Sequence, residues 1–344
     1  MTASKLAVAV RSAVDDWKQA TTLDQRTTAL ASPDELGMTL GSAVAKKLES
    51  AGEDLAAMRQ HAVAAPFVLL AGVFEPGELP DTPDWFTPVP DVSGTQMGRA
   101  AAIAAHAFLG LETISYGSEN SGELFVSLTA IPGEGKFARK SQGGLRGHTD
   151  AVSFPFNGDS DASNARIAPS PDLVTLVGLR NPNAVPTTVM VLGEALAKLS
   201  PEDVHELKLG QFSIGAQTTF LDGMQDILGE VHVAIDEPVL KDAAIGTMVR
   251  FSHSNVSPTE PGGAAEVAAE NFTKACGEIA KPVAIEPGDV LLVNNRLCLH
   301  GRAEVGVDIG GHSRWLLRTY ALNTTQLDDS RRHLGDRPAH VLYP

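Results

Sequence analysis

The chain has 344 residues, 43% of them hydrophobic and 20% charged, which is ordinary for a globular protein with a substantial core. It carries 42 acidic and 27 basic residues, and the resulting formal charge of -15 disfavours binding to nucleic acid or to an anionic membrane surface. The two cysteines form no CxxC pair, charged residues interrupt the apolar N-terminus, and no apolar stretch reaches the length of a membrane span. We therefore expect a soluble cytoplasmic protein without a nucleic-acid or membrane partner; these features predict no oligomeric state.

Residues 1–111 are expected to be mainly helical. Leu6, Val10, Val14 and Trp17 repeat at helical spacing, and "SPDE" at 32–35 is a plausible capped helix start. The short apolar run "APFVLLAGV" at 65–73 is more typical of a buried strand. The alanine-rich "GRAAAIAAHAFLGL" at 98–111 predicts a further helix.

From about residue 112 the pattern changes to short apolar runs separated by Gly, Pro, Asn and Asp, such as "ELFVSLTAI", "DLVTLVGL", "DVLLVNN" and "RWLLRTYAL". This texture indicates an all-β sandwich or barrel rather than alternating βαβ units. Two helical insertions interrupt it, at 193–208 and 262–280. We expect one domain with a helical part at 1–111, a β core with lid insertions at 112–325 and a polar tail at 326–344.

The stretch "GGLRGHTDAVSFPF" at 143–156 contains a candidate metal clamp. On an extended strand, positions two apart share a face, so His148 and Asp150 would point the same way. A histidine and a carboxylate on one face supply two-thirds of the 2-His-1-carboxylate triad that holds Fe(II). By itself the pair is more simply explained as two polar side chains near a turn. His300, at the end of the strand-like "EPGDVLLVNNRLCLHGR", is the candidate third ligand, and its alternative is a buried neutral histidine.

Two arginines follow His300 in "HSRWLLRTYAL". On a strand Arg314 and Arg318 lie on one face, about 13 Å apart. Two guanidinium groups on an otherwise apolar strand are costly unless anions meet them. The partners could be internal acids or solvent; the functional interpretation is two bound carboxylates. A metal triad with two carboxylate receptors indicates 2-oxoglutarate-dependent oxygenation of an acid-bearing substrate.

With these motifs, "HTD", "PGDVLLVNNRLCLHGR" and "RWLLR", the sequence resembles the Fe(II)/2-oxoglutarate oxygenases. The resemblance is to the clavaminate synthase-like family, specifically its amino-acid hydroxylase branch, and it covers about residues 112–325. It implies a mainly β protein with α decoration, built on a double-stranded β-helix (jelly-roll) core with N-terminal helices and helical insertions.

The resemblance also implies ligands. His148, Asp150 and His300 would bind Fe(II), with 2-oxoglutarate and O2 as co-substrates. Arg314 would hold the distal carboxylate of 2-oxoglutarate in a bidentate pair. Thr188, in "NAVPTTVMV", matches a threonine that touches the same co-substrate, although a one-residue difference in the preceding loop would shift this match to Thr187.

Substrate-binding residues follow from the same resemblance. Arg318 matches the arginine that receives the substrate α-carboxylate, and Glu119 and Asn120 lie in a segment, "GSENSGELF", that resembles one reaching the substrate. Arg146 would share a face with the iron ligands and could meet substrate or co-substrate, or balance nearby acids. Phe154, in the aromatic loop after the triad, is a further substrate candidate.

The sequence also departs from the family. Relatives commonly carry HxE where this chain has HxD, and hydroxylases of basic amino acids tend to show "R-Y-D-x-D" in a lid where this chain has "RFSHSN" at 250–255. The missing acids predict a free amino acid, or a derivative, whose distal end is not cationic, used in specialised metabolism. The expected outcome is hydroxylation, or desaturation or ring closure such as cyclopropanation. The loops at 151–165 and 220–233 are candidate lids.

Two competing interpretations remain at this stage. A non-catalytic jelly-roll protein that binds a small carboxylic acid or a metal would use the arginines but need no open coordination position. A zinc hydrolase would use the triad but leave the paired arginines without an evident role.

Overall fold

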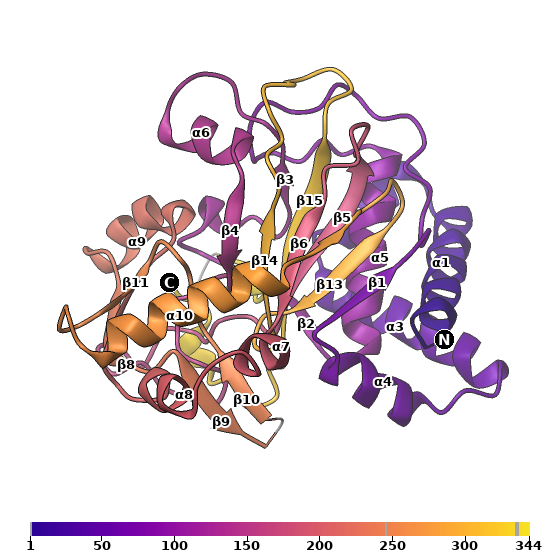
Figure 1. Cartoon of the computed structure of the whole chain (residues 1–344). Helices are drawn as coiled ribbons and strands as arrows, with labels where there is room; N and C mark the ends of the chain where they lie inside the picture. The colour runs from indigo at the N-terminus through magenta and orange to yellow at the C-terminus, as the bar shows by residue number, and fades with distance from the viewer. Residues whose placement is uncertain (1, 245, 334–336) are drawn as a thin grey trace.

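The computed structural model describes residues 2–244, 246–333 and 337–344 (Figure 1). The N-terminal part is helical as predicted: α1 (Thr2–Ala20), α2 (Leu23–Leu30), α3 (Pro33–Ser50), α4 (Leu55–Ala64) and α5 (Ser93–Phe108). In α3, Leu36, Leu40, Val44 and Leu48 recur every four residues and are all buried, so one face of the helix packs into the core. These helices form a layer against the large sheet.

The large sheet has the strand order β1-β13-β5-β15-β2-β16, and β3 pairs with β15. Its strands are β1 (Phe67–Leu70), β2 (Glu112–Tyr116), β3 (Val126–Leu128), β5 (Leu173–Arg180), β13 (Val290–Asn294), β15 (Trp315–Leu322) and β16 (Val341–Leu342). The predicted strand at 65–73 is therefore confirmed, and it joins the N-terminal part to the β core. The segment expected as a polar tail ends in β16, a buried strand that pairs with β2 in parallel.

Side chains of strand β15 point alternately into two different hydrophobic cores, one on each face of the large sheet. Trp315, Leu317 and Ala321 pack into the core shared with the N-terminal helices. Leu316, Tyr320 and Leu322 face the other way, into a second core beneath the small sheet. Because side chains alternate along a strand, Arg314 and Arg318 belong to this second face.

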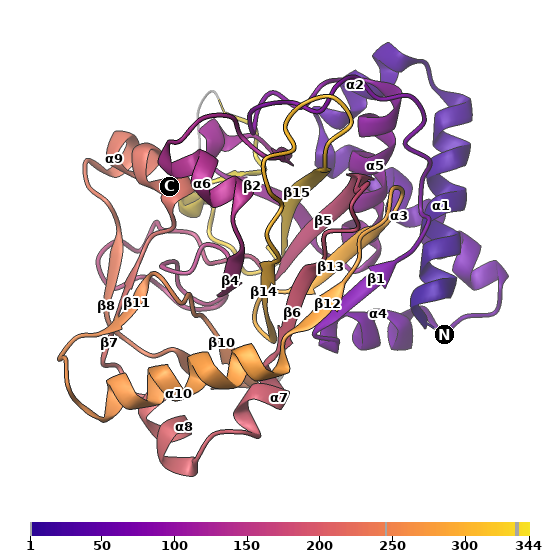
Figure 2. The same cartoon turned by 45° about the horizontal axis from the view of Figure 1, so that its top comes forward.

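The small sheet faces that second side of the large sheet (Figure 2). It has the order β12-β6-β14-β4, formed by β4 (Leu145–His148), β6 (Thr187–Val191), β12 (Lys281–Val283) and β14 (Cys298–Arg302). Val189 and Cys298 of this sheet share one core cluster with Ile114 and Leu176 of the large sheet. Among the described strands the two sheets stay open at their edges, so they form two facing layers instead of a closed barrel.

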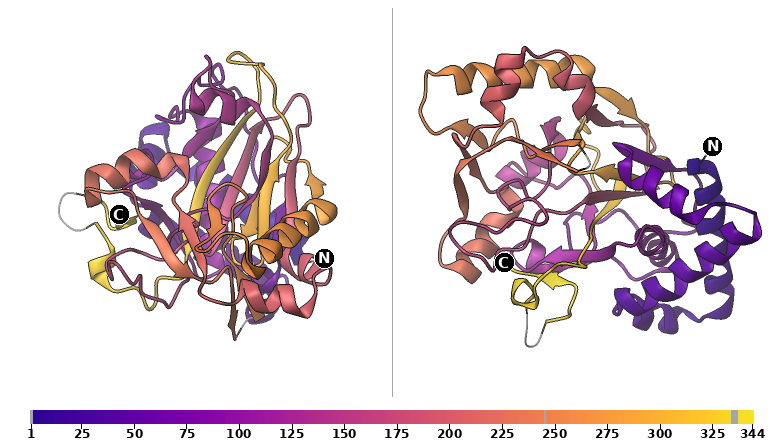
Figure 3. Two further views of the ribbon diagram at one scale, coloured as in Figure 1. Left: turned by 60° about the vertical axis from the view of Figure 1, so that its left-hand side comes forward. Right: turned by 90° about the horizontal axis from the view of Figure 1, so that it is seen from below.

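The remaining elements cover the small sheet. They are α6 (Lys136–Gln142), α7 (Leu192–Leu196), α8 (Pro201–Leu207), α9 (Leu221–Leu228), α10 (Ala264–Ile279), the sheet β11-β7-β8 (Val256–Pro258, Phe212–Gly215, Val233–Glu237) and the hairpin β9-β10 (Leu240–Ala243, Gly246–Val249). Both predicted helical insertions are confirmed as α7–α8 and α10. Figure 3 shows that α10 and the N-terminal helices lie on opposite sides of the molecule.

Helices take up 36% of the chain and strands 22%. The mainly β description therefore applies to the core that carries the site, while helices dominate the layers around it. Within the described ranges, none of the helices combines the length and apolar character that a bilayer crossing requires.

Candidate metal centre and active site

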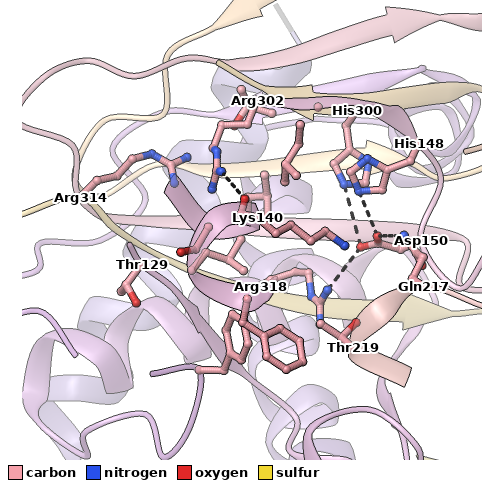
Figure 4. A pocket seen from close by; sticks show the side chains of 18 residues that line it. Thr129, Lys140, His148, Asp150, Gln217, Thr219, His300, Arg302, Arg314 and Arg318 are labelled. Atoms are coloured by element: carbon pink, nitrogen blue, oxygen red, sulfur yellow. Dashed lines mark hydrogen bonds and ion pairs between the residues drawn. The ribbon is translucent and has the colours of Figure 1, made fainter. Parts of the chain in front are cut away.

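The three predicted metal ligands come together at the inner face of the small sheet (Figure 4). His300 on β14 pairs directly opposite His148 on β4, and Asp150 follows two residues after His148. His148 Nε2 lies 3.4 Å from Asp150 Oδ1, and His300 Nε2 lies 3.9 Å from Asp150 Oδ2. One ligand atom from each residue lies within 4.8 Å of the others, so the group could hold a metal ion.

Neighbouring groups fix the orientation of these ligands. His148 Nδ1 donates a hydrogen bond to the carbonyl oxygen of Arg146 at 2.9 Å, which leaves the lone pair of Nε2 facing the centre. Asn295 accepts from the backbone N–H of Asp150 and donates to its carbonyl oxygen. Gln217 Nε2 donates to Asp150 Oδ1 at 3.1 Å. The carboxylate is thus held at both its backbone and its side chain.

The protonation states suit metal binding. Burial favours the neutral form of Asp150, but the hydrogen bond with His148 and the electrostatic influence of His300 and Arg318 hold the pKa of Asp150 well below its usual range. Burial, with the neighbouring His148, lowers the pKa of His300 to about 3. At neutral pH the site therefore offers a carboxylate and a neutral imidazole, the forms that bind metals.

Unpaired buried atoms support this fit. Asp150 Oδ2 and His300 Nδ1 are buried and have no hydrogen-bond partner among the described residues. A buried carboxylate oxygen without a donor is costly unless a ligand meets it. Two histidines and one carboxylate suit Fe(II) and leave further coordination positions for small ligands.

Arg314 lines the same cavity and forms no ion pair with another residue of the described chain. Its side chain is buried with 5% exposure, no carboxylate in the described chain pairs with it, and its Nε has no hydrogen-bond partner. Burial, with the positive charge of Arg302, lowers the pKa of Arg314 to about 9. Thr129, on the same cavity wall, has a buried hydroxyl that also lacks a partner. At this end of the cavity, the free donors of Arg314 and Thr129 could therefore bind an anion.

Arg318 has the opposite surroundings. Its Nη2 lies 2.7 Å from Glu119 Oε2, and its Nη1 lies 3.7 Å from Asp150 Oδ2. Burial alone would lower the pKa of Arg318, but Glu119, Tyr320 and Asp150 together raise it above its usual value. Glu119 also accepts hydrogen bonds from Thr219 and from the hydroxyl of Tyr320. Glu119 therefore does not line the cavity itself but contacts two residues that do, Arg318 and Thr219.

Of the two adjacent threonines on β6, Thr187 is the one that lies beside the cavity. In the pairing of β6 with β14, Thr187 lies opposite Arg302 and Val189 lies opposite His300, so Thr187 shares the face of the iron ligand. Thr187 lines the cavity, whereas Thr188 pairs with Gly301 on the other face. Thr187, the alternative that the loop length left open, therefore lines the cavity, and Thr188, the expected contact of 2-oxoglutarate, does not.

Three other expected substrate residues lie away from the cavity wall. Arg146 is exposed and its guanidinium donates to the carbonyl oxygen of His253, because a bulge shifts the register between β4 and β14 and brings Leu145 to the cavity instead. Phe154 is fully buried against Tyr116, with ring centroids 5.1 Å apart. Asn120 stands in a tight turn with a φ of 47° and does not line the cavity.

The two candidate lid loops are tied to each other. His232, from the stretch 220–233, donates from Nε2 to Asp161 Oδ2 of the stretch 151–165 at 2.9 Å, and both side chains are buried. The wall over the cavity is built instead by α6 and a loop before α5, through the aromatic rings of Phe86 and Phe137 and the ammonium group of Lys140.

Sequence reasoning missed several of these cavity residues. Arg302 lies two residues after His300, so strand alternation could have placed it on the same face. Gln217 and Thr219 lie around a short turn, and Lys140 lies on a seven-residue helix. Neither segment has a periodic pattern that points toward the metal ligands.

Comparisons with known proteins agree with this geometry. No family model matches the chain. It is 25% identical over 309 residues to an L-asparagine oxygenase of Streptomyces coelicolor, covering 83% of this chain and 78% of that protein. The chain is thus similar to oxygenases of the Fe(II)/2-oxoglutarate-dependent kind. The resemblance based on the histidine and arginine motifs is confirmed.

Solved structures confirm the fold. An asparagine oxygenase in complex with Fe(II), 2S,3S-3-hydroxyasparagine and succinate matches with a TM-score of 0.75 at 21% identity, over 98% of this chain and 97% of that one. The non-heme iron oxygenase OrfP in complex with Fe, succinate and (3S)-hydroxy-L-Arg matches with a TM-score of 0.73 at 19% identity, over 98% and 96%. The predicted jelly-roll core is that of these oxygenases. Both structures contain iron and succinate, and a further OrfP structure contains Fe and alpha-ketoglutaric acid, which are the predicted metal and co-substrate. The non-catalytic alternative finds no support among them.

Proposed function

We propose that this protein is an Fe(II)- and 2-oxoglutarate-dependent oxygenase that hydroxylates an unactivated C–H bond of a free amino acid or an amino-acid derivative. The observation that carries the proposal is the His148, Asp150 and His300 triad in one cavity with Arg314, a buried guanidinium that has no anionic partner in the described chain. Similar oxygenases whose solved structures hold 3-hydroxyasparagine or 3-hydroxyarginine together with succinate support hydroxylation as the outcome.

The triad would hold the iron. Bound iron supplies the activation of O2, coupled to decarboxylation of 2-oxoglutarate, so that one oxygen atom enters succinate and the other enters the substrate. Asn295 and Gln217 would keep the Asp150 carboxylate in place during turnover, since they bond to its backbone and its side chain.

Arg314 would receive the distal carboxylate of 2-oxoglutarate. A guanidinium and a carboxylate form two parallel hydrogen bonds, which fixes the direction of the bound molecule as well as its affinity. The Thr187 side chain lines the same wall and would contact this co-substrate. The partnerless hydroxyl of Thr129 would donate a further hydrogen bond.

Arg318 and Glu119 would bind the amino-acid head group together. A free amino acid carries a carboxylate and an ammonium group on one carbon, and this pair of side chains offers one charge of each sign 2.7 Å apart. Arg318 would take the α-carboxylate and Glu119 the α-ammonium. The orientation of the head group then decides which carbon faces the iron.

A cytoplasmic location is part of the proposal. Cys276 and Cys298 are both buried free thiols, and free cysteines are typical of a reducing compartment.

Succinate formation tests the function. The wild-type protein, supplied with Fe(II), 2-oxoglutarate and O2, should release succinate in amounts that depend on an added amino acid, with matching hydroxylated product. His148→Ala should abolish this release. Arg146→Ala is the matched control, since its side chain points away from the cavity, and it should retain wild-type turnover. Succinate release that no amino acid or derivative stimulates would contradict an amino-acid oxygenase.

A further inference from the structure

The cavity has a marked surplus of positive charge. Lys140, Arg302, Arg314 and Arg318 all line it. Among the lining residues in the described chain, Asp150 is the only acid. Glu119 adds a second carboxylate where it pairs with Arg318. Four positively charged side chains and two carboxylates therefore surround the cavity, which leaves a surplus of two positive charges.

Lys140, like Arg314, has free hydrogen-bond donors, but no role in binding 2-oxoglutarate is assigned to it. It lies near the end of α6, and its side chain extends into the cavity toward Asp150 (Figure 4). No hydrogen bond or ion pair joins its ammonium group to another described residue, although Asp150, Glu119 and Arg318 all act on it electrostatically. Lys140 is exposed as a residue, but the protein around its ammonium group removes part of the surrounding water and so lowers its pKa.

Arg302 holds Lys140 in this position. Its Nη2 donates to the carbonyl oxygens of Lys140 at 3.0 Å and of Gly143 at 2.6 Å, and its Nε donates to the carbonyl oxygen of Ala303. These bonds tie α6 to strand β14, which also carries His300. The backbone of Lys140 is thereby fixed relative to the iron ligands. Its ammonium group is a cation in the cavity that takes part neither in binding iron nor in binding 2-oxoglutarate.

The charge balance indicates what this cation meets. Fe(II) and 2-oxoglutarate carry two positive and two negative charges, so together they leave the surplus of the cavity unchanged. An amino acid with an uncharged side chain is a zwitterion and also leaves it unchanged. A cavity lined mainly by positive charge favours a ligand that brings negative charge. A side-chain carboxylate would reduce the surplus by one charge.

We propose that Lys140 binds an anionic group at the distal end of the amino-acid substrate, so that the enzyme selects acidic amino acids. This inference rests on the proposed function, because it takes the head group to lie at Arg318 and Glu119. The aromatic rings of Phe86 and Phe137 line the cavity with Lys140 and give the intervening methylene groups an apolar wall. A cationic side chain has no acid to meet there beyond the iron ligand Asp150.

The test measures binding as well as turnover. The anaerobic wild-type complex with Fe(II) and 2-oxoglutarate should show a weak visible absorption band, and binding of an amino acid beside the iron should shift it. Titrations with L-aspartate, L-glutamate and L-2-aminoadipate are compared with L-asparagine, L-glutamine, L-norleucine and L-lysine. We expect a dicarboxylic amino acid to bind about 10- to 100-fold more tightly than its amide, since a charge-assisted hydrogen bond is lost in the amide.

Variants assign the preference to Lys140. Lys140→Met should remove the preference for the acid over its amide and leave the 2-oxoglutarate affinity within about twofold of wild type. Lys140→Glu should reverse the preference toward L-lysine. Arg139→Met, which removes a neighbouring exposed positive charge outside the cavity, should keep the wild-type preference. Thermal melts of each variant confirm that it is folded.

The results that would overturn the inference are specific. Equal binding of acid and amide, failure of every dicarboxylic amino acid to shift the band, or a Lys140→Met variant that loses 2-oxoglutarate instead of the acid would each contradict it. Absence of the visible band from the wild-type protein is a different result, because it would contradict the iron site itself.

Discussion

Arg314 and Arg318 lie four residues apart on one face of the same sequence segment, yet the two ends of the cavity that they border differ in charge. Arg314 has no anionic partner in the described chain, whereas Arg318 lies between Glu119 and Asp150. The pKa of the first guanidinium is lowered to about 9 and that of the second is raised. The Arg314 end suits a ligand that brings only negative charge. The Arg318 end suits a ligand that brings both signs, as an amino-acid head group does.

Removing the lone guanidinium should produce the largest selective effect. Arg314→Ala should weaken 2-oxoglutarate binding by about 100-fold or more, because the distal carboxylate loses a buried charged partner. The amino-acid affinity, measured at saturating 2-oxoglutarate, should change little. Equal losses for both ligands would show that the two ends of the cavity are not specialised.

Gln217 supports the carboxylate of the iron ligand Asp150. Gln217→Ala should weaken iron binding by about 10- to 100-fold, since loss of a group that orients a metal ligand typically has this effect. Both 2-oxoglutarate and amino-acid affinities should recover at saturating iron. Iron titrations at fixed co-substrate measure the effect. An unchanged iron affinity would show that Gln217 does not orient Asp150 for iron binding.

Neutralising the acidic partner should affect the Arg318 end alone. Glu119→Gln keeps the shape of the side chain but removes the charge that pairs with Arg318, and it should weaken amino-acid binding about 10-fold. The 2-oxoglutarate dissociation constant should stay at its wild-type value. If Glu119→Gln leaves the amino-acid affinity intact, Glu119 acts only as structural support for Arg318.

The smallest predicted effect distinguishes two adjacent threonines. Thr187→Val should weaken 2-oxoglutarate binding by about 3- to 10-fold, the loss expected for one neutral hydrogen bond. Thr188→Val serves as the control on the opposite face of β6 and should behave as wild type. The reverse pattern would favour the original assignment to Thr188.

The parts of this site that the sequence predicts lie on strands or directly beside them: His148, His300 and Arg318 on β4, β14 and β15, and Asp150 and Arg314 within two residues of a strand end. His148 and Asp150 follow from alternation, His300 from its place at the end of an apolar strand, and Arg314 and Arg318 from their spacing of four residues. The helical insertions and the N-terminal helices were also predictable, because their apolar periodicity is regular.

The parts that failed depend on irregular or distant structure. A bulge moves Arg146 out of the cavity, and no local pattern marks a bulge of this kind. Lys140 reaches the cavity because Arg302, 162 residues away, bonds to its backbone. The pairing of β16 with β2 joins the C-terminus to a strand more than 200 residues earlier. Such contacts depend on tertiary packing, which the sequence pattern does not encode locally.

The central claim is that His148, Asp150 and His300 hold iron in a cavity where Arg314 receives 2-oxoglutarate. Anaerobic titration of the wild-type protein with Fe(II) and 2-oxoglutarate tests it most directly, followed by visible absorption and by iron content after desalting. We predict one iron per chain and an absorption band that saturates with one equivalent of 2-oxoglutarate, both lost in Asp150→Ala. A wild-type protein without the band, or an Asp150→Ala variant that keeps it, would contradict the account.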